Sequence, residues 1–178
     1  RLIAESGAKV GRLPIDNIVV APKVMQFKAA DTKAGTNVNE RIPDTEKYSE
    51  SSAGVILVWK DAKNELGFGK DAIILVDGHH RMDFAKRKGQ SEMNVLFVEA
   101  NTAKEARLEG AFANIRQGRG TAIDAAKIYR EASPEQIETF KPTSLVARQG
   151  RQLANLAPEL FELLTTGKLD IQRALAIS

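Results

Sequence analysis

The chain has 178 residues, of which 43% are hydrophobic and 28% are charged, and it contains no cysteine. That length fits one domain, or one domain with a smaller second one. The absence of cysteine excludes disulfide frameworks, cysteine-ligated zinc, iron–sulfur clusters and thiol nucleophiles, and it fits a reducing compartment. Because 26 Lys and Arg stand against 23 Asp and Glu, for a net charge of +3, nucleic-acid binding would need a local basic patch.

The sequence gives no sign of membrane association. No apolar run approaches the roughly 18 residues of a membrane-spanning helix, and no signal peptide is recognised. The chain starts at Arg1 and stops at Ser178 inside a predicted helix. We therefore expect it to be part of a longer protein.

Strands and loops are predicted for the first half. Short strands are expected at residues 13–20, 55–59 and 73–76, the first of them entered through Pro14. Residues 60–70 contain Gly67 and Gly69 and are typical of a hairpin connection. Residues 29–52 are polar, which predicts a long loop of the kind that is often functional or mobile.

A change of pattern follows. A helix is expected at residues 79–88, ended by Gly89, and a fourth strand at residues 93–98. Strand, helix and strand in close succession indicate an α/β unit. Thr102 and Glu105 form a capping-box pattern that opens the next helix, which runs to about Asn114.

No strand is predicted after residue 118. Helices are expected at residues 121–132, from residue 133, at residues 144–156, at residues 158–165, and after Asp170. The sequence therefore predicts an α+β chain, with a small mixed-sheet domain at residues 1–117 followed by a helical region at residues 118–178.

The densest candidate site is the run Val-Asp-Gly-His-His-Arg at residues 76–81, which holds both histidines of the chain. It joins a strand to a helix N-terminus, where unpaired backbone N–H groups and the helix dipole favour an anion. The histidines and Arg81 add donors that suit phosphate oxygens. The alternative is a turn with surface histidines, and a zinc site is disfavoured because adjacent residues on a helix point about 100° apart.

Two further segments carry cations and amides. Residues 112–120 combine two arginines, two glycines and two amides at a helix end, which fits a second phosphate clamp or a basic, glycine-capped helix end. Residues 145–156, with Gly150 between apolar positions, resemble a helix-turn-helix. The alternative is an ordinary helical hairpin. Side chains there that could contact DNA are Arg148, Arg151 and Gln152.

These segments occur in the order seen in the ParB/sulfiredoxin superfamily. Residues 76–81 resemble its phosphate-binding box, residues 114–117 look like the second box of ParB proteins, and residues 163–175 are similar to the helices after the ParB helix-turn-helix. The resemblance is strongest to ParB-like domains of large polyvalent proteins of phages and mobile elements. It covers about residues 13–177.

The resemblance implies a pocket for a nucleoside triphosphate, CTP or ATP, with Mg²⁺ as a second ligand. By position, the phosphates would face Gly78, His79, His80 and Arg81. From the other side they would be held by Asn114 and by Arg116 or Gln117, with Asn114 also the one candidate magnesium ligand. Gln26 and Lys28 would lie nearer the base or ribose.

Departures from the family pattern bear on the chemistry. Asp83 replaces the last arginine of the ParB box, and Ala113 stands where the second box has its acidic metal ligand, which weakens the case for magnesium. Sulfiredoxins carry a catalytic cysteine where this chain has His79, so the chain is not a sulfiredoxin.

The leading hypothesis is a ParB-like, nucleotide-binding and DNA-associated domain of a phage, plasmid or other mobile-element protein, acting in the cytoplasm of a bacterial host and able to form a homodimer. One alternative is an enzyme on the same fold: a CTPase or ATPase, a nuclease, or a small-molecule kinase, for which Asp77 or Glu40 could accept a proton. Another is a catalytically silent interaction module.

Overall fold

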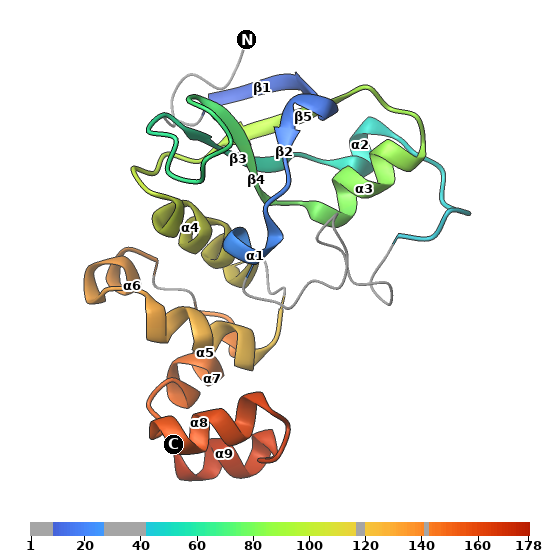
Figure 1. Ribbon diagram of the computed structural model, residues 1–178. Coiled ribbons are helices and arrows are strands. Elements are labelled where there is room, and N and C mark those ends of the chain that lie inside the picture. The colour runs from blue at the N-terminus through green and yellow to red at the C-terminus, as the bar shows by residue number, and fades with distance from the viewer. Residues whose placement is uncertain (1–8, 27–41, 117–119, 141–142) are drawn as a thin grey trace. The chain divides into compact units, whose positions relative to one another are not determined.

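The computed structural model describes residues 9–26, 42–116, 120–140 and 143–178 (Figure 1). The chain divides into two compact units, Arg1–Gly110 and Ala111–Ser178. The division falls inside one helix, α4 (Ala103–Arg116). The boundary predicted from the sequence, between residues 117 and 118, comes just after this helix and stays a prediction. Within the described ranges, no helix is long and apolar enough to cross a membrane.

The first unit is built on a mixed five-stranded sheet with the order β1-β5-β3-β4-β2. Its strands are β1 (Lys9–Pro14), β2 (Ile18–Val19), β3 (Ile56–Asp61), β4 (Ala72–Asp77) and β5 (Glu92–Phe97). The β1–β5 and β3–β4 pairs are antiparallel, whereas β3–β5 and β2–β4 are parallel. The predicted mixed sheet, and with it the α+β class, is confirmed.

The single strand predicted for residues 13–20 is wrong. Pro14 ends β1, a 3-10 turn follows at Ile15–Asn17, and only Ile18–Val19 returns to the sheet as β2. Because β1 and β2 lie at opposite edges of the sheet, one continuous strand could not serve both. Proline has no N–H to continue the ladder, and the buried Ile15 donates its own N–H to the Ser91 carbonyl at 2.9 Å.

Each face of the sheet carries its own hydrophobic core. On one face, Val58 and Leu75 pack with Met82 and Ala85 of α3 (His79–Arg87). On the other face, Trp59, Ile74 and Val76 pack with α4 and with α1 (Pro22–Met25). Neighbouring residues thus point to opposite faces, as the period of two in a strand requires. The sheet is a central layer between helices (Figure 1).

Two of the predicted connections can be compared with the structure. Residues 62–71 join the antiparallel strands β3 and β4, so the predicted hairpin is confirmed. The long loop predicted at residues 29–52 contains the start of a short helix, α2 (Glu50–Ala53), and its residues 29–41 lie outside the described ranges.

The second unit contains helices after the end of α4. These are α5 (Ala122–Glu131), α6 (Pro134–Phe140), α7 (Leu145–Leu153), α8 (Pro158–Thr165) and α9 (Ile171–Ile177). Side-chain caps fix several starts: Thr121 and Asp124 form a capping box on α5, and Ser144 and Asp170 cap α7 and α9. Apolar residues of α5, α7, α8 and α9, among them Ala126, Leu153, Leu164 and Ala174, form the core of this unit. The predicted helical array is confirmed.

Candidate functional site

The first candidate site is the turn from β4 into α3. Gly78 is the N-cap of α3, with φ of 102° and ψ of 25°, a left-handed conformation that side chains rarely adopt. A Cβ atom on Gly78 would lie 2.6 Å from Cγ2 of Ile56, so the backbone rests directly on the first residue of β3. Glycine is therefore required twice at this position, for the φ angle and for the space.

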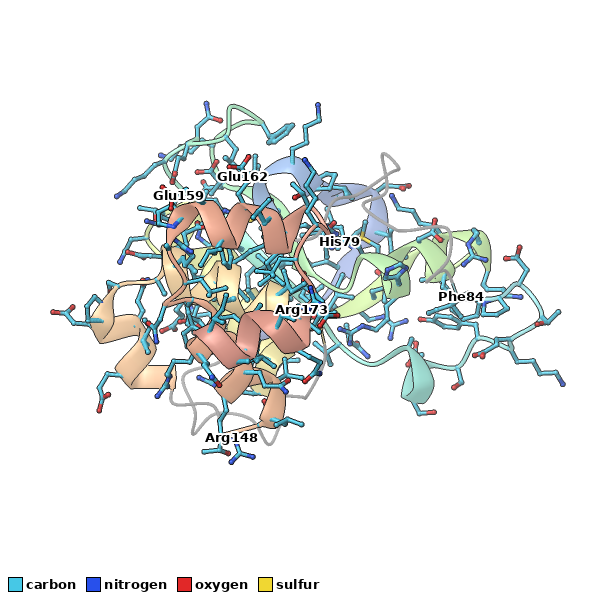
Figure 2. The ribbon with its side chains drawn as sticks, turned by 90° about the horizontal axis from the view of Figure 1, so that it is seen from below. His79, Phe84, Arg148, Glu159, Glu162 and Arg173 are labelled. Atoms are coloured by element: carbon cyan, nitrogen blue, oxygen red, sulfur yellow. The ribbon has the colours of Figure 1, made fainter. Side chains whose placement is uncertain are left out.

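His79, labelled in Figure 2, is the first residue of α3. Only 5% of it is exposed. Its Nε2 atom is buried and has no hydrogen-bond partner among the described residues. Burial lowers the pKa of His79 from its ordinary 6.5 to about 4; the Asp77 carboxylate opposes the shift, and His80 adds to it. The imidazole is therefore neutral at neutral pH. A buried polar atom without a partner is unusual and indicates a place that a ligand group could complete.

Arg81 ties the turn to the residue just before β3. Its Nη1 atom donates to the Val55 carbonyl at 2.7 Å, and its Nη2 atom donates to Oδ2 of Asp77 at 3.2 Å. Both side chains of the Arg81–Asp77 pair are mostly buried, at 23% and 22% exposure. The sequence predicted that Arg81 faces phosphates, and that prediction is untested. What the geometry adds is that Arg81 also positions the turn.

Gln26 lies in the same part of the first unit. It follows Met25, which packs in one cluster with Val76, two residues before Gly78. The Gln26 carbonyl accepts a long hydrogen bond of 3.5 Å from Nη2 of Arg107 in α4. Lys28, predicted to act beside Gln26, lies outside the described residues.

The predicted second box lies at the end of α4. Asn114 is half-buried and Arg116 is exposed, and both belong to the second unit. Gln117 lies outside the described residues. That Asn114 and Arg116 hold the ligand opposite Gly78 to Arg81 therefore remains a prediction.

The residues of the turn fit a phosphate group better than they fit a metal ion. The glycine turn and the buried, unpartnered His79 atom suit an anion at the start of α3. Magnesium prefers several oxygen ligands. The nearby carboxylates of Asp77 and Asp83 instead accept hydrogen bonds from Arg81 and Arg87, and no cluster of three His, Asp or Glu side chains exists in the part of the chain that the structure describes.

The second candidate site is the outer face of α7. Its inner face, formed by Ala147, Gly150 and Leu153, is buried. A Cβ atom on Gly150 would lie 2.4 Å from Cβ of Ala125 in α5, so Gly150 is the point where the two helices touch. Gly150 therefore lies inside α7 and supports close helix packing. It does not form the turn of a helix-turn-helix.

The outer face of α7 carries cations and amides. A shallow pocket of ≈ 280 Å³ is lined by Arg148, Arg151, Gln152 and Asn155, which are all exposed. Arg148 points away from the helical unit (Figure 2). The Arg151 guanidinium lies 5.5 Å from the centre of the Tyr129 ring, and Gln152 Nε2 donates to the Leu175 carbonyl at 2.8 Å. Two of the four side chains are thus held in place by neighbouring helices.

Asn155 was missed by the reasoning from sequence. It follows Arg148, Arg151 and Gln152 at the spacing i, i+3, i+4 and i+7, which brings residues to one face of a helix. That spacing was readable in the sequence. The helix ends at Leu153, and Asn155 belongs to the turn that follows it, with its N–H donating to the Gln152 carbonyl.

Comparison with known proteins gives a structural match only. No family model matches the sequence, and no curated protein is similar enough to match. The C-terminally truncated chromosome-partitioning protein ParB from Caulobacter crescentus, complexed to the centromeric parS site, matches with a TM-score of 0.50 at 16% identity, over 94% of this chain and 83% of that chain. The same protein complexed with CTP-gamma-S matches with a TM-score of 0.40 at 16% identity, over 95% and 91%.

The chain has a ParB-like fold. The match spans both units, and it confirms the predicted fold class of a mixed-sheet domain followed by helices. At 16% identity the likeness concerns the fold, so the ParB-like fold gives the two candidate sites an architecture without assigning them a ligand.

Proposed function

We propose that the chain is a ParB-like domain that binds a nucleoside triphosphate and associates with DNA. The observation that carries the nucleotide part is the β4–α3 turn: a left-handed Gly78 opens α3 beside a buried His79 whose Nε2 atom has no partner among the described residues. This arrangement suits phosphate oxygens. The ParB of similar fold has a solved complex with CTP-gamma-S, which is in keeping with the proposal.

Each residue of the turn would have a distinct part. The first backbone N–H groups of α3 have no partner within the helix, so they can donate to phosphate oxygens. His79 would donate from its neutral ring through Nε2, and the left-handed Gly78 would turn the chain so that α3 begins at the phosphate. Arg81 would hold the turn in shape through Asp77 and the Val55 carbonyl while adding positive charge.

Isothermal titration calorimetry with CTP, ATP and GTP, each with and without magnesium, tests the nucleotide part. We expect one nucleotide to bind, and we expect His79→Gln and His80→Gln to weaken it about tenfold each, the usual range for a hydrogen bond to a charged group. The matched control is Lys86→Gln, an exposed cation near the other end of α3. Absence of binding by every nucleotide contradicts the proposal.

The pH dependence of binding gives a second readout. A phosphate beside His79 favours the protonated imidazole, so binding would raise its pKa from about 4. Nucleotide affinity should then rise as the pH falls from neutral, and this rise should be absent in His79→Gln. An unchanged pH profile in the variant would place the phosphates elsewhere.

The DNA part rests on the outer face of α7. Two arginines and two amides line one pocket there, and these are the side-chain types that contact phosphates and base edges in the major groove. The ParB of similar fold was crystallised with the parS site. Fluorescence anisotropy with duplexes of mixed sequence tests this part, and failure to bind any duplex at low salt contradicts it.

Three finer points belong to the same proposal. Hydrolysis would be detected as phosphate release, with His79→Gln as the control. A homodimer would be detected by light scattering with and without nucleotide. A phage, plasmid or other mobile element as the source, and the cytoplasm of its bacterial host as the place of action, rest on the resemblance of residues 13–177 to polyvalent mobile-element proteins; the genes flanking the coding sequence would decide the source.

A further inference from the structure

The hairpin tip, defined as residues 62–71 between β3 and β4, is tightly organised by its own polar groups. Asp61 is fully buried, and its two carboxylate oxygens accept the N–H groups of Glu65 and Leu66 at 2.8 and 2.9 Å. The side chain of Asn64 accepts the Gly69 N–H at 2.8 Å. These hydrogen bonds fix the backbone of the turn.

Phe68 stands at the end of this tip and is 53% exposed. Its two neighbours, Gly67 and Gly69, have φ of 77° and 113°, and a Cβ atom on either would meet nothing within 4 Å. The ring is thus flanked by bare backbone in open space. About half of the Phe68 side chain is therefore open to solvent and available for contact with a ligand.

The charges at residues 60–71 balance in number, with three lysines and three carboxylates, but they differ in their partners. The carboxylates of the hairpin are engaged: Asp61 inside the turn, Glu65 with the Ala103 N–H at 2.9 Å, and Asp71 with Lys60 at 3.2 Å. Lys63 and Lys70 are exposed and have no ion-pair partner among the residues that the structure describes. The hairpin tip therefore presents one aromatic ring with one of these lysines before it and the other after it in the chain, while the Glu65 carboxylate between Lys63 and Phe68 is held by the backbone of α4.

We propose that the hairpin tip binds single-stranded nucleic acid, with a base stacked on Phe68 and the adjacent phosphates contacted by Lys63 and Lys70. An exposed ring combined with cations is how sequence-tolerant single-strand binders hold their ligand. The contact lies wholly in the first unit, at the end of β4 opposite to the β4–α3 turn (Figure 1). It does not rest on the function proposed for that turn or for α7.

Two other partners fit less well. A protein hot spot is surrounded by a ring of further contacts that exclude water, and membrane insertion needs several apolar side chains together. Of the neighbouring residues, only Leu66 is apolar and large, and it is half-buried within the cluster beneath the sheet. A base needs only one ring face, so the isolated Phe68 matches a base best.

Fluorescence anisotropy of a labelled oligo(dT) of about 20 nucleotides tests the proposal, because such a length covers one or more single-strand sites. We expect Phe68→Ala to weaken binding about tenfold, the loss of one base–aromatic stack, and Phe68→Trp to retain it with quenching of the new indole fluorescence. Lys63→Gln with Lys70→Gln should make the salt slope about 1.4 less steep, at about 0.7 for each phosphate.

Matched controls separate this contact from general charge attraction. Val10→Ala removes another exposed apolar side chain of the first unit and should leave the affinity unchanged. Polyglutamate of similar length measures attraction to an acidic surface, and circular dichroism verifies that each variant is folded. The proposal is overturned if the wild type does not bind oligo(dT), if Phe68→Ala binds as well as the wild type, or if polyglutamate binds equally well with the same dependence on Phe68. Loss of duplex binding in Arg148→Gln has no bearing on these outcomes.

Discussion

The backbone of Gly78 contacts the side chain of Ile56, and this contact fixes where α3 begins. Ile56 is fully buried, and its Cγ2 and Cβ atoms lie 2.6 and 3.0 Å from where a Cβ on Gly78 would be. Because Ile56 is the first residue of β3 and Gly78 directly follows β4, the contact sets the height of the α3 N-terminus over the sheet. The predicted phosphate-binding residues are thus placed by a packing contact inside the core.

Replacing Gly78 with alanine should destabilise the first unit. Both the left-handed backbone and the overlap with Ile56 oppose a side chain there, for a loss of about 2–4 kcal/mol in the free energy of unfolding. Gly89→Ala is the matched control, since Gly89 also has a positive φ, 71°, yet has nothing within 4 Å of a Cβ. It should lose only about 1 kcal/mol. Urea unfolding followed by Trp59 fluorescence measures both, and equal losses would argue against the contact.

His79 should make the protein less stable in mild acid. Its pKa is about 4 in the folded chain and 6.5 when exposed, so between these values the unfolded state binds the proton and the folded state does not. Protons therefore favour unfolding in this window, and stability falls by up to about 1.4 kcal/mol per pH unit as the pH drops from 6.5 towards 4. Above pH 6.5 the contribution is constant.

The measurement for His79 compares urea unfolding of the wild type and His79→Gln at several pH values in this window. The glutamine variant should show a shallower loss of stability, because it has no imidazole to protonate. His80→Gln keeps the burial of His79, which is the main cause of its lowered pKa, and should retain most of the wild-type slope. A direct check is the NMR titration of the two histidines, in which a His79 resonance that titrates near 6.5 would contradict the prediction.

The sequence predicted the elements better than the contacts between them. Periodic apolar residues and capping pairs such as Thr121 with Asp124 are local signals, and they placed most strands and helices to within a few residues. The path from β1 to β2 was missed because nothing local says that residues 13–14 and 18–19 belong to opposite sheet edges. That depends on which strand each one pairs with, which is a long-range property.

The same limit applies to the candidate site. The motif at residues 76–81 identified the turn, but the reason for its glycine is Ile56, and one role of Arg81 is a bond to the Val55 carbonyl. In each case the partner lies more than 20 residues away in the sequence; Arg81 and Val55, for example, are 26 residues apart. The depressed pKa of His79 also could not be predicted, because it comes mainly from burial.

Gly150→Ala should destabilise the second unit, against the usual trend. Alanine in a helix is favoured over glycine by about 1 kcal/mol. At this position, however, the new Cβ would lie 2.4 Å from Cβ of Ala125 and 3.0 Å from the Ala126 N atom, so α7 must move away from α5. We expect a net loss of about 1–3 kcal/mol in thermal or urea unfolding.

A double variant tests whether the Gly150 effect comes from the Ala125 contact. Ala125→Gly removes the nearest atom, so Gly150→Ala should be less harmful in that background, while the backbone contact with Ala126 keeps the rescue partial. Gln149→Ala, a neighbouring change in the same helix, should have little effect. Additive losses in the double variant would show that the two residues are not in contact.

Arg148 should contribute to DNA binding through charge if the outer face of α7 contacts phosphates. Removing the charge of a side chain that contacts one phosphate makes the plot of log affinity against log salt less steep by about 0.9. Arg148→Gln should therefore weaken duplex binding most at low salt. Arg173→Gln is the control, because Arg173 is an exposed arginine of the same unit on α9, outside the α7 pocket. Anisotropy titrations of one duplex at several salt concentrations measure both slopes. If Arg173→Gln changes the slope as much as Arg148→Gln does, the duplex is held by the general charge of the unit, and α7 has no special role.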